Sequence, residues 1–329
     1  MSLTREPPRR RPRHPRHPHA ALVALACAVA ATTVLAAPAP AHAFTGDNHE
    51  TITRSALPWE PRTLKEMADA RTGAVNANDR GDYFRQGILH CDNADYLAPR
   101  HAPGYPRTRD EATTELLACI RSSVARFRAA VRAADGLVDA EGRVSARATD
   151  LGTPCPWDER PGRAKCHVLE QLGRGWHQIE DFYSHSNWSD RTTGTIGVTN
   201  PPGLARTAIA PFLAVGRYST MTDAAWTKEA AALVPEELST GCYPDFDSTG
   251  KRPADCDGRV RHNGALAKDT PAAPRSGNGN FRRATDLAGR DIARQWDDFQ
   301  AALRAAYPGR RGEQMICALV HDRPATGCP

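Results

Sequence analysis

The stretch RAKCHVLEQLGRGWHQIEDFYSHS, residues 163–186, combines an apolar repeat with a polar one. Its large apolar side chains recur at helical intervals, at Val168, Leu169, Leu172, Trp176, Ile179 and Tyr183, and this period is typical of an amphipathic α-helix. His177, Asp181 and His185 are spaced four residues apart, so they share one face of that helix. The stretch therefore predicts a core helix that also carries a column of candidate metal ligands.

Helical periodicity also appears in other parts of the chain. The segments that show it are residues 48–57, 61–78, 109–134, 222–234 and 280–307. No segment has the sustained apolar alternation of a β-strand. Residues 240–279 are rich in Gly, Pro and Asp, a composition typical of an irregular, functional or disulfide-pinned loop. The sequence predicts an all-α protein with a single helical domain over residues 44–329.

The first 43 residues differ from the rest in kind. Six Arg precede the apolar run AALVALACAVAATTVLAA, residues 20–37, and Ala41-His42-Ala43 follows it. A basic region, an apolar region and a small-x-small site together are typical of a secretory signal peptide. The alternative is a membrane anchor, but about 18 residues of mostly Ala and Val are weak for a span. We expect cleavage after Ala43, secretion, and a mature chain without a stable membrane span that begins at Phe44.

The leader also accounts for the net charge of the chain. Of the 43 Lys and Arg and the 38 Asp and Glu, residues 1–43 hold six Arg and one Glu, which leaves 37 basic and 37 acidic residues. The remaining chain is formally neutral, and it has no dense Lys/Arg stripe. Charge therefore does not favour a nucleic-acid partner.

Eight cysteines follow the leader. An even number in a secreted chain indicates disulfides, although many connectivities are possible. The pairs that lie close in sequence are Cys155–Cys166, Cys242–Cys256 and Cys317–Cys328, which leaves Cys91–Cys119. The rival interpretation is zinc-binding thiolates, but the chain has no C-x-x-C motif.

The column of His177, Asp181 and His185 has two interpretations. One is a polar stripe in which the histidines are hydrogen-bonded to Asp181. The other is a metal centre, because imidazole and carboxylate together suit zinc. Each helical turn rises about 5.4 Å, so three ligands in one column cannot all reach a single ion. A metal centre here would hold two or more ions, with Asp181 able to bridge.

The motif WHQIEDFYSHSNW, residues 176–188, resembles the H-x-x-x-D-F-x-x-H-x-N-[WY] motif of Het-C-like proteins. These in turn resemble the superfamily of zinc-dependent phospholipase C and P1/S1 nuclease. The resemblance implies an all-α fold with a cluster of zinc ions that hydrolyses phosphodiesters. In that superfamily the mature N-terminal residue binds zinc through main-chain atoms, and a histidine shortly after it is another ligand. Phe44 and His49 match these positions in FTGDNHE, residues 44–50.

The segment FRQGILHCDNADYL, residues 84–97, is similar to the superfamily's G-x-x-x-x-D segment through Gly87 and Asp92. The resemblance implies that Asp92 is a ligand and the general base, with His101 as the histidine that follows it. One ion would then be held by Asp92, His101, His177 and Asp181. A second would be held by Phe44, His49 and Asp181.

The third ion would be held by His185 and a later H-x-x-x-E or H-x-x-x-D pair. The chain departs from the pattern here, because only His262 and His321 follow His185. His262, with Asp269 seven residues on, is the candidate from the irregular loop. We expect His321 to be a surface residue, and His90 and His167 receive no ligand role, although His90 is near enough to Asp92 to support it.

We therefore expect a secreted hydrolase with two or three Zn²⁺ ions and a phospholipase C-like activity on phospholipid or small-molecule phosphodiesters. A P1/S1-type nuclease is one alternative. The other is a non-catalytic Het-C-like protein that acts in interaction or toxicity and retains a partial metal site.

Overall fold

The computed structural model describes residues 44–243 and 256–328. The expected signal peptide, residues 1–43, lies outside the described residues, as does part of the expected loop, residues 244–255. The described residues all belong to one contact-defined unit, residues 40–329.

The described residues are helical and contain isolated β-bridges but no sheet. The α-helices are α1 (Gly46–Ala56), α2 (Pro61–Ala68), α3 (Arg109–Ala133), α4 (Ala146–Thr149), α5 (Ala164–His185), α6 (Val215–Tyr218), α7 (Asp223–Leu233), α8 (Asn280–Ala306), α9 (Arg310–Val320) and α10 (Pro324–Gly327). Short 3-10 helices are η1 (Val75–Ala77), η2 (Gly81–Arg85), η3 (Gly87–His90), η4 (Ala134–Leu137) and η5 (Pro211–Leu213). The prediction of an all-α protein is confirmed.

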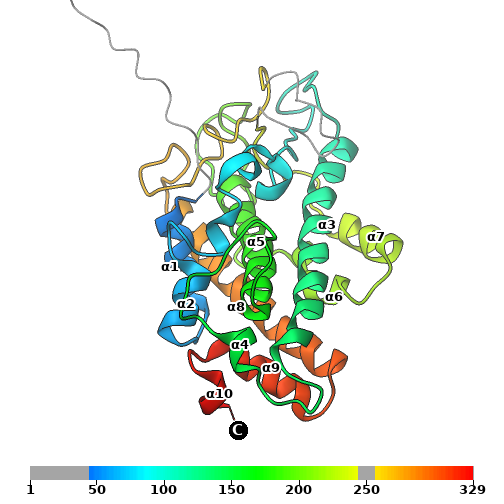
Figure 1. Cartoon of the computed structure of the whole chain (residues 1–329). Helices are drawn as coiled ribbons and strands as arrows, with labels where there is room; N and C mark the ends of the chain where they lie inside the picture. Colours follow the sequence, from blue (N-terminus) through cyan, green and yellow to red (C-terminus); the bar gives the residue numbers. More distant parts are fainter. Residues whose placement is uncertain (1–43, 244–255, 329) are drawn as a thin grey trace, which may run out of the picture. The chain divides into compact units, whose positions relative to one another are not determined.

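Helix α5 is the central element, and it packs between α3 on one side and α8 on the other (Figure 1). Every residue from Leu172 to Asp190 is buried. The apolar face of α5 meets an aromatic cluster in which the ring of Trp59 lies 5.9 Å from that of Trp176 and 4.9 Å from that of Trp296. The polar face of α5 is buried as well, so its His and Asp side chains face other polar groups and not water.

Local sequence signals explain where the helices begin and end. Helix α3 begins at a capping box, in which Thr108 accepts a hydrogen bond from the backbone N–H of Glu111 and the Glu111 carboxylate accepts one in return. Helix α2 ends at Ala68, earlier than predicted. The Asp69 carboxylate accepts hydrogen bonds from the backbone N–H groups of Arg71 and Thr72, and such a turn competes with further helix. The prediction of one helix over residues 61–78 was therefore wrong. The sequence analysis also did not predict α9.

Gly173 of α5 permits a close approach between this helix and the backbone near Ala74. A Cβ atom at Gly173 would lie 2.5 Å from the backbone carbonyl carbon of Ala74, far inside van der Waals contact. Only glycine lets the backbone before η1 lie directly on α5. This contact brings the segment that carries Asp79 next to the ligand-bearing half of the helix.

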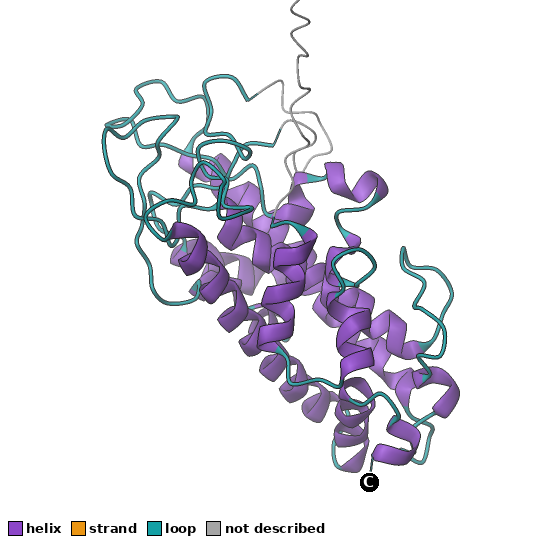
Figure 2. Ribbon diagram, turned by 90° about the vertical axis from the view of Figure 1, so that its left-hand side faces the viewer, coloured by secondary structure: helices purple, strands orange, loops and turns teal. Residues whose placement is uncertain are grey.

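Long loops gather at the end of the helical bundle opposite the C-terminus of the chain (Figure 2). Described residues 240–243 and 256–279 contain turns and bridges but no helix, as expected for this segment. The buried ammonium of Lys268 donates to the carbonyl oxygen of Ser186 and pairs with Asp190 at 3.1 Å. Arg275 donates to the same carboxylate at 2.7 Å. These buried ion pairs tie the loop to the end of α5.

Four disulfides link the described elements, and their pairs are those expected from the sequence: Cys91–Cys119, Cys155–Cys166, Cys242–Cys256 and Cys317–Cys328. Such cross-links are compatible with a secreted protein. Among the helices of residues 44–243 and 256–328, none combines the length and the apolar character needed to cross a membrane.

Candidate metal centre

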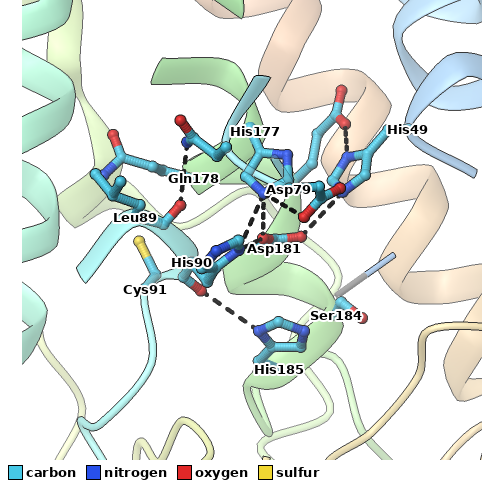
Figure 3. Close-up of polar contacts among 12 residues, drawn as sticks. His49, Asp79, Leu89, His90, Cys91, His177, Gln178, Asp181, Ser184 and His185 are labelled. Carbon is cyan, nitrogen blue, oxygen red and sulfur yellow. Dashed lines mark hydrogen bonds and ion pairs between the residues drawn. The ribbon is translucent and has the colours of Figure 1, made fainter. Parts of the chain in front are cut away.

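Asp181 lies at the middle of a buried His/Asp cluster (Figure 3). Its Oδ2 atom is 2.8 Å from Nε2 of His177 and 2.8 Å from Nδ1 of His90, and those two nitrogens are 3.0 Å apart. Around a tetrahedral ion with bonds of 2.0–2.1 Å, neighbouring ligand atoms lie about 3.3 Å apart. We call His90, His177 and Asp181 the first group, and their three ligand atoms are spaced closely enough to bind one metal ion.

The second group consists of His49, Asp79 and His177. His49 comes from α1 and lies on the other side of Asp181, with its Nε2 atom 3.2 Å from Oδ1 of that carboxylate. Its ring stacks on that of His177 at 4.4 Å. Asp79 Oδ1 lies 3.5 Å from Nε2 of His177. Oδ2 of Asp181 therefore faces His90 and His177, whereas Oδ1 faces His49, which is the arrangement of a bridging carboxylate.

The third group consists of Asp92, His185 and His262. Asp92 Oδ1 lies 3.1 Å from Nδ1 of His185 and 3.0 Å from Nδ1 of His262. The other ring nitrogen of His185 is 3.5 Å from Oδ1 of Asp269. This group brings together α5, the segment after η3 and the loop before α8, so it exists only in the folded chain.

Backbone pairing places His262 in the third group. Its N–H donates to the carbonyl oxygen of Cys242 at 3.0 Å, and the N–H of Cys242 donates to Val260 at 2.7 Å. The disulfide from Cys242 to Cys256 joins the same two segments. His262 is therefore fixed by main-chain contacts on both sides, although it comes from an irregular loop.

Burial leaves many polar atoms of the cluster without a hydrogen-bond partner. In the described part of the chain these atoms include His49 Nε2, Asp79 Oδ1, His90 Nε2, Asp92 Oδ2, His177 Nδ1, Asp181 Oδ1, His185 Nε2 and His262 Nε2. An unsatisfied buried polar atom costs about 1–3 kcal/mol, so a cluster of them is costly unless something binds there. Nitrogen and oxygen donors of this kind fit a divalent metal ion.

The charges inside the cluster are strongly coupled. Burial favours the neutral form of Asp181, but the charges of His177 and His49 outweigh it and hold the pKa of that carboxyl well below its ordinary value. Burial likewise opposes ionisation of Asp92, and His262 and His185 lower its pKa. Both carboxyl groups are therefore ionised, as a metal ligand must be.

The pKa values of His49 and His185 shift in the opposite direction. Burial by itself lowers the pKa of His49, but Asp181 and Glu180 outweigh it and raise the pKa to about 10. Burial also lowers the pKa of His185, but the charge of Asp92 and the nearby carboxylate of Asp269, 3.5 Å from Nε2, raise it well above its usual value. In the absence of a cation, protons on these histidines balance the charge of the ionised carboxylates, and a metal ion would have to displace those protons.

The structure does not bring together one ion set implied by the resemblance, that of Asp92, His101, His177 and Asp181. His101 is not in the cluster, because its Nε2 atom contacts Glu237 at 2.8 Å at a partly exposed position. Asp92 faces His185 and His262 instead of His177 and Asp181. His321 is partly exposed and contacts Glu60 at 2.7 Å, outside the cluster as expected.

His90 and Asp79 belong to the cluster but were not predicted as ligands from the sequence. The sequence indicates His90 only as a neighbour of Asp92, yet in the structure it contacts Asp181 directly. Its signal was present in the sequence as the spacing His90-Cys91-Asp92. Asp79 lies in the turn between η1 and η2, where the sequence has no helical periodicity, so no sequence pattern singled it out.

Phe44 lies beside the cluster and is fully buried. Its ring meets the ring of His49 edge to face at 5.9 Å and that of Phe281 at 6.1 Å. The expected cleavage before Phe44 falls at the boundary of the described residues, so its main-chain ligand role stays a prediction.

No protein-family model matches this chain, and neither the curated proteins nor the solved structures contain a significant match. The functional interpretation therefore rests on the residues of the cluster and on their geometry.

Proposed function

We propose that this protein is a zinc-dependent phosphodiester hydrolase of the phospholipase C type, with two or three ions in the His/Asp cluster. The observation that carries the proposal is the position of Asp181, whose two oxygens face His90 and His177 on one side and His49 on the other. A carboxylate shared between adjacent histidine sites is typical of centres with several metal ions, and such centres catalyse phosphoryl-group hydrolysis.

Zinc is the metal that the donor atoms favour. Each of the three groups combines imidazole nitrogens with a carboxylate oxygen, a mixture that suits zinc better than the all-oxygen sites preferred by Mg²⁺ and Ca²⁺. No cysteine thiolate competes for the metal, because the eight cysteines of the described chain form disulfides.

When bound, zinc supplies Lewis-acid stabilisation of the phosphate and lowers the pKa of a water nucleophile. The residues of the chain position that chemistry. Asp92 uses Oδ1 toward His185 and His262, and its Oδ2 atom has no hydrogen-bond partner. Oδ2 is therefore the atom of Asp92 that is available to orient a water or accept its proton.

Access to the cluster is narrow. Asp79 and Asp269 each expose 14% of their side chains, whereas His177, Asp181 and His185 are fully buried. A phosphodiester group on a small or flexible substrate reaches such a site more easily than a rigid duplex does. This supports a phospholipid head group over double-stranded nucleic acid, in agreement with the neutral charge of residues 44–329.

The same burial favours one second candidate, a non-catalytic metal-binding protein of the Het-C-like kind. A closed metal site without room for substrate is typical of structural zinc. In that case the ions would stabilise the fold, and the protein would act through its surface.

Metal analysis followed by activity assays tests the proposal. We expect the purified protein to retain at least two zinc ions per chain after dialysis and to release phosphocholine from phosphatidylcholine vesicles. Single-stranded DNA is the matched substrate for the nuclease alternative. Zinc retention without cleavage of either substrate would favour the non-catalytic candidate, and retention of one ion or none would refute the multinuclear centre.

A further inference from the structure

We propose that Glu180 is the positioning residue of His49, holding its ring so that Nε2 and not Nδ1 is the metal-ligating atom. The inference rests on the proposed metal centre, but it does not depend on which substrate the protein cleaves. Neither the column of ligands on α5 nor the resemblance to Het-C-like proteins implies a role for Glu180.

The carboxylate of Glu180 contacts the nitrogen of His49 that faces away from the cluster. Its Oε2 atom lies 2.5 Å from Nδ1 of His49, and its Oε1 atom accepts a hydrogen bond from the hydroxyl of Thr53 at 2.8 Å. Glu180 and His49 are fully buried. Both oxygens therefore contact groups of α1, and Glu180 belongs to none of the three groups of ligand atoms.

Two adjacent residues of α5 thus contact the same imidazole from opposite sides. Asp181 faces Nε2 of His49 at 3.2 Å, while Glu180 faces Nδ1. A neutral imidazole carries one proton and one lone pair. The Glu180 carboxylate can only accept a hydrogen bond from Nδ1, so the neutral, metal-bound form of His49 carries its proton on Nδ1 and directs the lone pair of Nε2 toward Asp181 and the rest of the second group.

Packing restricts the ring in the same orientation. The ring of His49 stacks on that of His177 with planes 26° apart, and Phe44 meets it at 88°. Thr53, which holds Glu180, follows His49 by one helical turn on α1. The contact between α1 and α5 therefore fixes the carboxylate and the histidine as one unit, and the carboxylate makes the imidazole a stronger ligand without taking a coordination position.

Two substitutions separate charge from geometry. Glu180→Gln retains an oxygen that accepts from Nδ1 of His49 and an amide that donates to the Thr53 hydroxyl, but it removes the negative charge. Glu180→Ala removes both contacts. Glu170 is the matched control, because it is also buried on α5 but binds the backbone N–H groups of Asp158 and Glu159 and the side chain of Arg174, outside the cluster.

The direct test is long-range ¹H–¹⁵N NMR of the ¹⁵N-histidine-labelled protein loaded with zinc alone. His49 signals are assigned by comparison with a His49→Ala variant, and zinc affinity is measured by competition with a chelator. For the wild type we expect a proton on Nδ1 of His49 and zinc on Nε2. For Glu180→Ala we expect a drop in zinc affinity of about 10–100-fold and loss of the fixed Nδ1 proton.

Glu180→Gln is expected to keep the Nδ1 proton and to show a smaller drop in affinity, whereas Glu170→Gln should change neither measurement. Zinc on Nδ1 in the wild type would overturn the inference, as would a folded Glu180→Ala variant with unchanged affinity and an unchanged His49 spectrum. A wild type that binds no zinc overturns the inference together with the proposed function. A wild type that binds zinc through Nε2 but cleaves no phosphodiester overturns the proposed function alone.

Discussion

His90 and Asp92 are separated by a single residue, yet their side chains enter different groups of the cluster. His90 contacts Asp181 at 2.8 Å, and Asp92 contacts His262 at 3.0 Å. The residue between them, Cys91, has a left-handed backbone with φ of 52° and is bonded to Cys119 of α3. This turn aims the two neighbouring side chains at different ligand sets, and the disulfide anchors it.

Replacing both Cys91 and Cys119 by serine should therefore weaken metal binding as well as the fold. We expect a loss of about 2–5 kcal/mol in the free energy of unfolding, as for other native disulfides, and reduced zinc retention. Chemical denaturation and metal analysis measure the two effects. Cys317 and Cys328 provide the control pair, because their disulfide joins α9 to the C-terminal segment. Their replacement should leave zinc retention unchanged.

Asp181→Asn should remove metal from two groups at once, since each oxygen of Asp181 faces a separate set of histidines. Asp92→Asn should affect the third group alone. Metal content per chain after dialysis distinguishes the two variants. Equal losses from both would contradict the bridging role of Asp181. His321→Ala is the control and should retain all of the metal, because His321 contacts Glu60 instead.

His90→Ala should lower zinc affinity by at least about 10–100-fold, the loss typical even of a residue that only orients a ligand. His101→Ala should not, because His101 contacts Glu237 and lies outside the three groups. Chelator competition on both variants decides between the two assignments. The ligand set first implied by the resemblance gives the reverse outcome, with His101 essential and His90 dispensable.

The metal-free protein should lose stability as pH rises from about 6.5 toward 10. The pKa of His49 is raised from 6.5 to about 10 in the folded state, so the folded chain binds this proton more tightly than the unfolded chain does. The stabilisation of the folded chain by this proton is fully present below pH 6.5 and is lost as pH approaches 10. Thermal melts in the presence of a chelator, compared with those of His49→Ala, measure it. A difference in melting temperature that stayed constant across this range would contradict the prediction.

Zinc must displace the extra proton of His49 before it binds there, so the apparent zinc affinity should rise as pH rises from about 6.5 toward 10.

The carboxyl groups of the cluster change the stability of the metal-free protein in the opposite direction. Folding lowers the pKa values of Asp181 and Asp92. Their contribution to the stability of the folded chain is therefore present above about pH 4 and is lost as the pH falls further.

A protein that begins at Phe44 should bind zinc more completely than one with two extra residues before it. Phe44 is buried beside His49, and an α-amino group at that position would be an additional nitrogen ligand. N-terminal sequencing of the secreted protein establishes the natural start. Equal metal content in the two forms would show that Phe44 contributes packing and no ligand.

The sequence by itself determined four of the helices, α3, α5, α7 and α8, and the column on α5. The extents predicted for residues 109–134, 163–186, 222–234 and 280–307 agree with α3, α5, α7 and α8 to within one residue at each end. Hydrogen bonds between residues four apart make helical periodicity a local property. For the same reason His177, Asp181 and His185 could be assigned to one face, and sequence proximity identified three of the four disulfides directly.

Tertiary structure alone decided which residues meet that column. Asp79, His90 and Asp92 reach α5 through a 3-10 segment whose path depends on the left-handed turn at Cys91 and on the close contact at Gly173. Glu180 and His49 are 131 residues apart in sequence, and they meet because α1 and α5 both pack against α8. These contacts depend on side-chain directions and long-range packing, which no local period encodes, so the sequence pointed to His101, which lies outside the three groups, and gave His90 no ligand role.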